Sequence, residues 1–127
     1  MRFMMLMIPK GYEQAAPGAM PDADAVARMM KYNESLQKAG VLLALDGLHP
    51  PSMGARVSFS GGKPKVTDGP FTEAKEVIGG YAIVRAATRA EAIALAQRVV
   101  DVHVAAGVPE FEMEIRPLFD AHEGCAP

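Results

Sequence analysis

The 127-residue chain lacks the devices that staple very small or secreted proteins, since it has one cysteine, no tryptophan and only 6% aromatic residues. The single cysteine, Cys125, can form no internal disulfide and lies in a tail rich in Gly, Ala and Pro. The fold must therefore depend on a hydrophobic core, for which this length is sufficient, and a reducing, cytoplasmic location is expected.

The sequence also lacks an excess of one charge and any long hydrophobic run. The net charge is −2 and the basic residues are scattered, so nucleic acid and anionic membrane are not expected as direct partners. The apolar run at the N-terminus stops at Pro9 without a small-residue cleavage site, and no stretch is long enough to form a membrane-spanning helix.

Sequence signatures of metals and cofactors are missing as well. Three dispersed histidines, His49, His103 and His122, show no metal-ligand spacing, and there is no phosphate loop, dinucleotide fingerprint or Gly-x-Ser-x-Gly elbow. The sequence therefore predicts no metal site and no bound cofactor.

What the chain does contain is an alternation of strand-like and helix-like apolar patterns. Strands are predicted at 2–8, 41–45, 55–60, 63–67, 77–85 and 111–116, with helices from Asp22 or Asp24 to Gly40 and from Thr88 to Gly107. Gly61-Gly62 supplies the tight turn of a hairpin between the two halves. The order predicts an α+β fold, a ferredoxin-like split βαβ sandwich with a β-hairpin insertion.

We expect one domain over residues 1–119, followed by a loosely ordered tail over 120–127. Helices on one face of the sheet would leave the other face in need of a partner. Two apolar sheet faces can bury each other, so the sequence predicts a homodimer with its sheets face to face, or a dimeric α/β barrel.

The segment from Val66 to Tyr81 carries the most local structural signals, beginning with the turn Asp68-Gly69-Pro70-Phe71. Pro70 fixes its own φ, and Gly69 can adopt backbone angles that other residues cannot. In one interpretation Asp68 only locks this turn by bonding the backbone two residues on, and Phe71 is a core plug. In the other, the turn holds Asp68 at a pocket mouth, where burial raises its pKa for acid–base chemistry, and Phe71 is a pocket wall.

Other candidates lie around this turn in the sequence. Lys75 could neutralise Asp68 or bind an anionic ligand, whereas Glu73 would not face Lys75 on a helical turn because the two are two residues apart. The Gly79-Gly80 step is expected to leave one place on the sheet that no side chain covers.

Three more residues have both a structural and a functional interpretation. His49 follows a buried strand, where it is either an exposed loop residue or a catalytic imidazole. His103 falls on an apolar helical stripe, where it is either a hydrogen-bonded core residue or the acid–base partner of a carboxylate. Asn33 is either a core-edge amide bonded to backbone or a pocket residue.

Several motifs together resemble the YCII-related, DGPF-motif family. They are Arg2-Phe3-Met4-Met5-Leu6, Gly47-Leu48 before Pro50, Val66-Thr67-Asp68-Gly69-Pro70-Phe71 with Glu73, Lys75-Glu76 and Gly79-Gly80-Tyr81, and Glu114-Ile115-Arg116-Pro117-Leu118. The resemblance covers nearly the whole chain. It implies a dimeric α+β barrel of ferredoxin-like protomers, a bacterial source and an activity that is largely unassigned in the family.

The resemblance also implies a His–Asp pair in a pocket beside the dimer interface. Asp68 carries over through the motif, whereas no motif matches the histidine, so His49 and His103 both remain candidates. Other members of the wider group occur beside, or fused to, extracytoplasmic-function sigma factors.

Two functions follow as hypotheses. The first is a homodimer that binds an unknown small polar molecule around Asp68, which acts as acid or base with His49 or His103. The alternative is a non-catalytic regulatory or interaction module associated with an extracytoplasmic-function sigma factor. The expected ligand-binding residues are Gly69, Pro70, Phe71, Glu73, Lys75, Gly80 and Asn33.

Overall fold

The structure is a computed structural model that describes residues 1–16, 22–71, 76–107 and 110–119. Its elements are β1 Arg2–Pro9, α1 Ala23–Lys38, β2 Leu42–Gly47, β3 Ala55–Ser60, β4 Lys63–Asp68, β5 Gly80–Arg85, α2 Arg89–Ala105 and β6 Phe111–Pro117, with short 3-10 turns at Tyr12–Gln14 and Pro51–Met53. The predicted order of elements is confirmed. The strand expected at 77–85 begins three residues later than predicted, and the strand expected at 41–45 extends to Gly47.

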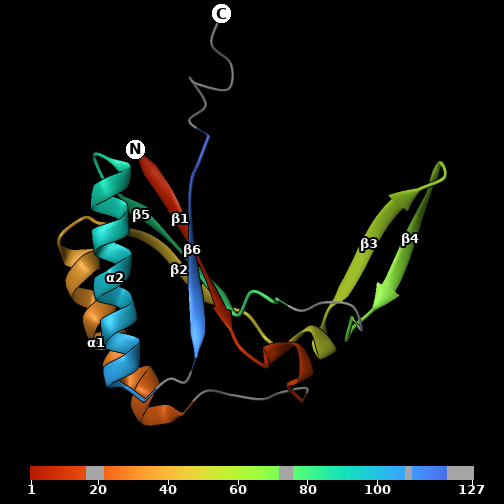
Figure 1. Ribbon diagram of the computed structural model, residues 1–127, viewed down its shortest axis with the longest axis horizontal. Helices are drawn as coiled ribbons and strands as arrows, with labels where there is room; N and C mark the ends of the chain where they lie inside the picture. Colours follow the sequence, from red (N-terminus) through yellow and green to blue (C-terminus); the bar gives the residue numbers. More distant parts are fainter. Residues whose placement is uncertain (17–21, 72–75, 108–109, 120–127) are drawn as a thin grey trace, which may run out of the picture.

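Four strands form one antiparallel sheet in the order β2-β5-β1-β6, and β3 and β4 form a separate two-stranded sheet. Both helices lie on the same face of the four-stranded sheet (Figure 1). This arrangement confirms the predicted ferredoxin-like α+β fold. The nearly continuous apolar sequence of β1 is explained by its position at the centre of the sheet, between β5 and β6.

The core lies between this sheet and the helices. Its buried residues are Phe3, Met5, Leu42, Val84, Ala86, Ala92, Leu95 and Ala96. On α2, the alanines Ala92 and Ala96 present little side-chain volume, so the helix backbone can lie close to the sheet. Among the described residues, no helix has both the length and the apolar character needed to cross a membrane.

The helix ends follow the predicted capping signals. Asp22 Oδ2 accepts a hydrogen bond from the backbone N of Ala25 at 3.1 Å, and Gly40, with φ +74°, follows the end of α1. Thr88 Oγ1 accepts from the backbone N of Glu91 at 3.2 Å. The Glu91 carboxylate bonds Ala87 N at 2.9 Å, one residue before the position that a standard capping box would use.

The cap on α2 gives a direct test of this local structure. Replacing Thr88 with alanine leaves one N–H of the first turn without its side-chain acceptor, so the free energy of unfolding should fall by about 1 kcal/mol. Thr88→Ser is the matched control because it keeps the hydroxyl. Urea denaturation would measure both variants, and an equal loss in the two would show that the hydroxyl does not cap the helix.

The face of the sheet opposite the helices has an apolar centre and a charged edge. Strand register places six half-buried side chains at that centre, namely Met4, Leu6, Ile8, Ala44, Tyr81 and Ile83. Glu112, Glu114 and Arg116 pair with Ile8, Leu6 and Met4, and they line the same face along β6. This face is the one that the sequence predicts to be covered by a second copy.

Candidate functional site

The Asp68 turn is fixed against the loop that follows β2. The backbone N of Gly69 donates to the carbonyl oxygen of Gly54 at 2.9 Å. A Cβ atom on Gly69 would lie 1.7 Å from the carbonyl oxygen of Pro51, so no larger residue fits without movement of the backbone. The peptide bond between Gly69 and Pro70 is cis. The backbone freedom predicted for this glycine is not what requires it, because its φ is not left-handed; the close approach to Pro51 is the reason.

A second set of backbone contacts joins the end of β1 to the same loop. Gly79 N donates to Met7 O at 2.8 Å, and Leu48 N donates to Gly79 O at 2.9 Å. The Tyr12 hydroxyl donates to the carbonyl oxygen of Leu48, and burial raises the pKa of that hydroxyl. These bonds hold the loop that begins at Leu48 between the end of β1 and the Asp68 turn.

The Gly79-Gly80 step is tightly packed, which differs from the open place that the sequence predicts. A Cβ on Gly79 would lie 2.8 Å from Pro9 Cγ, and a Cβ on Gly80 would lie 3.1 Å from the carbonyl oxygen of Asp46. The neighbouring segments therefore occupy the space that two missing side chains release. Gly80 is buried, and its role in ligand binding stays a prediction.

Asp68 ends β4, pairs with Ala55 and has an exposed side chain. The expected turn lock cannot form, because residue 70 is a proline and has no N–H to donate. Within the described part of the chain, the Asp68 carboxylate makes no hydrogen bond. The carboxylate is thus available to a ligand, but the expected burial is not present in the single chain.

Phe71 is half-buried beneath a cation rather than inserted in the core. The guanidinium carbon of Arg56 lies 4.1 Å from the centre of the Phe71 ring, a cation–π contact. Arg56 is not among the site residues that the sequence predicts. The hairpin register could have indicated Arg56. A turn at Gly61-Gly62 pairs Arg56 with Thr67, which is four residues before Phe71.

The two candidate histidines lie in different parts of the fold. His49 is exposed and immediately precedes Pro50-Pro51, whose second residue meets Gly69. His103 is half-buried on α2, where its Nδ1 donates to Val99 O at 2.8 Å and its ring centre lies 5.3 Å from that of Phe111. The fold therefore brings the segment of His49, and not α2, against the Asp68 turn. Neither catalytic role is tested by this placement.

Among the remaining predicted ligand residues, Asn33 lies on α1 rather than at this turn. Asn33 is half-buried on α1, in the helical layer, and its amide makes no hydrogen bond within the described ranges, so the expected backbone bond is not found. Pro70 is exposed beside Asp68. Glu73 and Lys75 lie outside the described residues. Their binding roles stay predictions.

One polar pair on the helix-free face is likewise not predicted from the sequence. The Tyr81 hydroxyl donates to Asp46 Oδ2 at 3.0 Å, and this hydrogen bond raises the pKa of Tyr81. Residues 46 and 81 are directly opposite in the β2–β5 ladder, but nothing in the sequence states that register.

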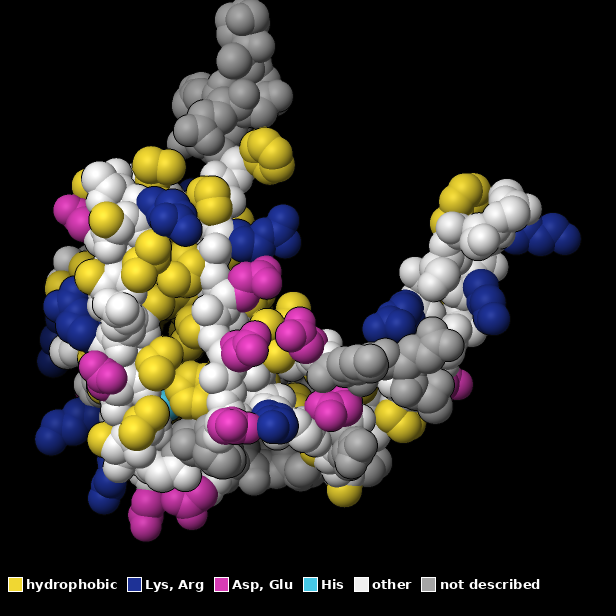
Figure 2. All heavy atoms as spheres, viewed as in Figure 1, with side chains coloured by type: hydrophobic (Ala, Val, Ile, Leu, Met, Phe, Trp, Pro, Cys, Tyr) yellow, Lys and Arg dark blue, Asp and Glu magenta, His cyan; other side chains and the backbone are white. Residues whose placement is uncertain are grey.

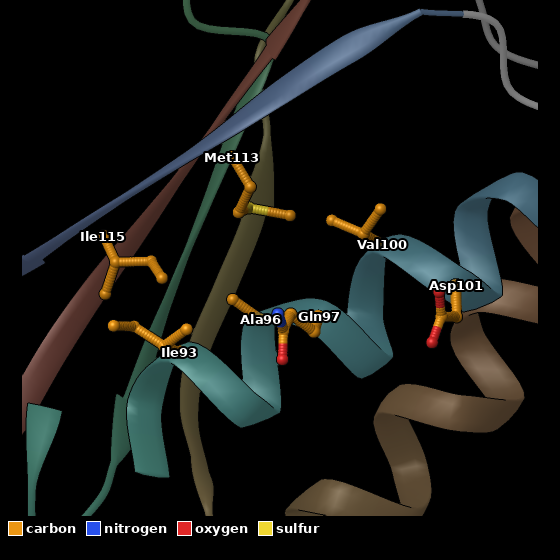
Figure 3. Close-up of a pocket in the computed structure, with 7 residues that line it drawn as sticks. All are labelled: Ile93, Ala96, Gln97, Val100, Asp101, Met113 and Ile115. Carbon is orange, nitrogen blue, oxygen red and sulfur yellow. The ribbon is translucent and has the colours of Figure 1, made fainter. Parts of the chain in front are cut away.

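A hollow of about 530 Å³ lies between α2 and β6 (Figure 3). It is lined by Ile93, Ala96, Gln97, Val100, Asp101, Met113 and Ile115. In Figure 3, Ile93 of α2 and Ile115 of β6 point toward each other across it. None of the seven is a predicted site residue. In the part of the chain that the structure describes, no three His, Cys, Asp or Glu side chains are grouped to hold a metal ion.

Comparison with known proteins agrees with the motif resemblance. The YCII-related domain family matches residues 1–117. An uncharacterised protein of Rhizobium meliloti (strain 1021) is 34% identical over 99 residues, which cover 78% of this chain and 72% of that protein. The chain therefore belongs to the YCII-related domain family.

Proposed function

We propose that the protein is a homodimer that binds a small polar molecule at the Asp68 turn, with Asp68 as general acid or base. The observation that carries this proposal is the contact between Gly69 and the Pro51 carbonyl, which leaves no room for a side chain. Such close packing holds the backbone next to Asp68 in one position, so the carboxylate extends from a defined point, as binding or proton transfer requires.

The groups around the turn suit a small polar ligand. Asp68 offers an exposed carboxylate that makes no hydrogen bond within the described residues, and Arg56 and Phe71 offer a cation and an aromatic ring in contact with each other. His49 is the better placed of the two candidate imidazoles, because its loop contacts the turn. His103 already donates Nδ1 to Val99 O.

The homodimer is supported by the helix-free face of the sheet. Met4, Leu6 and Ile83 are only half-buried there, although they lie at the centre of a four-stranded sheet. Apolar side chains in that position are normally covered, and a second copy of the same face would cover them.

Asp68→Asn tests the acid–base role. If the carboxylate binds the ligand or moves a proton, the variant should lose the small molecule that co-purifies with the wild type from native lysate, with at least about tenfold lower occupancy by native mass spectrometry. Its melting temperature should stay unchanged, because Asp68 is exposed and makes no hydrogen bond within the described residues.

Glu34→Gln is the matched control, since it makes the same carboxylate-to-amide change at an exposed position of α1. Full occupancy in Asp68→Asn would refute the role of the carboxylate. Recovery of a stoichiometric sigma factor, with no small molecule, would instead favour the regulatory module.

A further inference from the structure

The hairpin of β3 and β4 has one apolar and one basic face. Its register pairs Val57 with Val66 and Phe59 with Pro64, so these four side chains lie on the same face. They are not buried by the chain itself, because Val57, Phe59 and Val66 are 70%, 78% and 65% exposed. An exposed cluster of this kind on a narrow ribbon indicates a binding surface.

The hairpin pairs with no other strand in the described structure and projects from the body on the side opposite the helices (Figure 1). A two-stranded ribbon alone is at best marginally stable in water. The hairpin lies on the same side of the body as the helix-free face of the sheet. A second copy seated on that face would therefore meet the hairpin.

The charge of the hairpin indicates which kind of surface it can bind. Arg56, Lys63 and Lys65 lie on the face opposite Val57, and Asp68 is the one carboxylate in residues 55–68. This segment carries a charge of +2, so the rest of the chain carries −4 because the whole chain carries −2. Figure 2 shows Asp and Glu side chains on the side of the body that faces the hairpin, across the open space between them. Lys and Arg side chains lie along the hairpin.

We propose that each β3–β4 hairpin is a dimerisation arm that lays its apolar face on the second copy, near the charged edge of that copy's helix-free face. The proposal rests on the homodimer proposed above. Because the ribbon is only two strands wide, Lys63 and Lys65 can reach past its edges to Glu112 and Glu114 of the second copy.

The arm also completes the site. Asp68 pairs with Ala55 at the base of the hairpin, on the same face as Val57 and Val66. A second copy that covers this face therefore also approaches Asp68, which the single chain leaves exposed. The site is then incomplete in a monomer.

The first test removes the apolar face. Val57→Thr combined with Phe59→Thr keeps the strand propensity but removes the apolar contact, so the dimer dissociation constant should rise at least about tenfold by analytical ultracentrifugation. Ser60→Thr, on the opposite face, is the control and should leave the constant unchanged. Circular dichroism would verify that all variants fold.

The second test asks whether the contact is between chains. Lys63→Glu/Lys65→Glu and Glu112→Lys/Glu114→Lys should each weaken the homodimer at least about tenfold at low salt, because like charges then meet. Mixing the two variants restores both opposite-charge contacts, so a heterodimer of wild-type affinity should form. Restoration by mixing also shows that both variants fold.

Leu6→Glu, at the centre of the helix-free face, separates failure of the arm from failure of the homodimer. If Leu6→Glu gives monomers while the arm variants dimerise like the wild type, the arm proposal is wrong and the homodimer stands. A monomeric wild type would contradict the homodimer itself. Salt-sensitive binding of duplex DNA, lost in Lys63→Glu/Lys65→Glu without any change in dimerisation, would overturn the arm proposal and assign the basic face to nucleic acid.

Discussion

Gly69→Ala is expected to lower the free energy of unfolding by about 3 kcal/mol or more, because the new Cβ would lie 1.7 Å from the carbonyl oxygen of Pro51. The nearest atoms belong to the backbone, so no rotation of a side chain can relieve the contact. The turn or the 51–54 loop must move, which would also strain the hydrogen bond from Gly69 N to Gly54 O. Urea denaturation at fixed protein concentration would measure the loss.

Gly47→Ala is the matched control for this change. Gly47 lies in β2 with an ordinary φ, and a Cβ there would meet no atom within 4 Å. The free energy of unfolding of Gly47→Ala should therefore stay within about 0.5 kcal/mol of the wild-type value. If Gly69→Ala is as stable as Gly47→Ala, the close approach between the Asp68 turn and the Pro51 loop does not exist in solution.

Phe3→Ala should cost about 3 to 5 kcal/mol of unfolding free energy, the usual range for removing a buried phenylalanine. Phe3 is 1% exposed and packs in the core with Met5, Val84 and the buried alanines of α2. The cavity would lie in a central strand that pairs on both sides, so the surrounding backbone cannot readily collapse into it. Guanidinium denaturation followed by circular dichroism would measure the change.

Phe119→Ala makes the same substitution at a position that is 87% exposed and should change stability by less than about 0.5 kcal/mol. The Arg2 side chain donates a hydrogen bond to the backbone carbonyl oxygen of Phe119. The substitution does not remove that oxygen, so this hydrogen bond is kept. An equally small effect for Phe3→Ala would mean that β1 does not lie in the core as described.

The sequence allowed the elements and the fold class to be predicted because their signals are local. Apolar periodicity identified β1 and both helices, and the half-buried side chains of α1 include Val26, Met29 and Leu36, which helical spacing places on one face. Thr88, Asp22 and Gly40 act at the helix ends where short-range capping chemistry places them. Gly61-Gly62 likewise forms the turn between β3 and β4, with both residues at positive φ.

The candidate site could be predicted only in part, because its contacts join segments that are distant in sequence. Asp68 was conspicuous in its motif, but its exposure depends on a hairpin that pairs with no other strand of the described chain. The hydrogen bond between Tyr81 and Asp46 depends on the β2–β5 register, which no single residue encodes, and the Arg56–Phe71 contact depends on how the chain turns after β4.

By itself, the sequence determined that a central apolar strand, two capped helices and a Gly-Gly hairpin would assemble into an α+β sandwich, since each of these depends on neighbouring residues. Only the tertiary structure decided why Gly69 must be glycine, which histidine lies on the loop beside Asp68, and that the apolar face of the hairpin is left uncovered. These three features depend on how closely backbone segments that are distant in sequence approach each other. The hydrophobic pattern alone does not specify that distance.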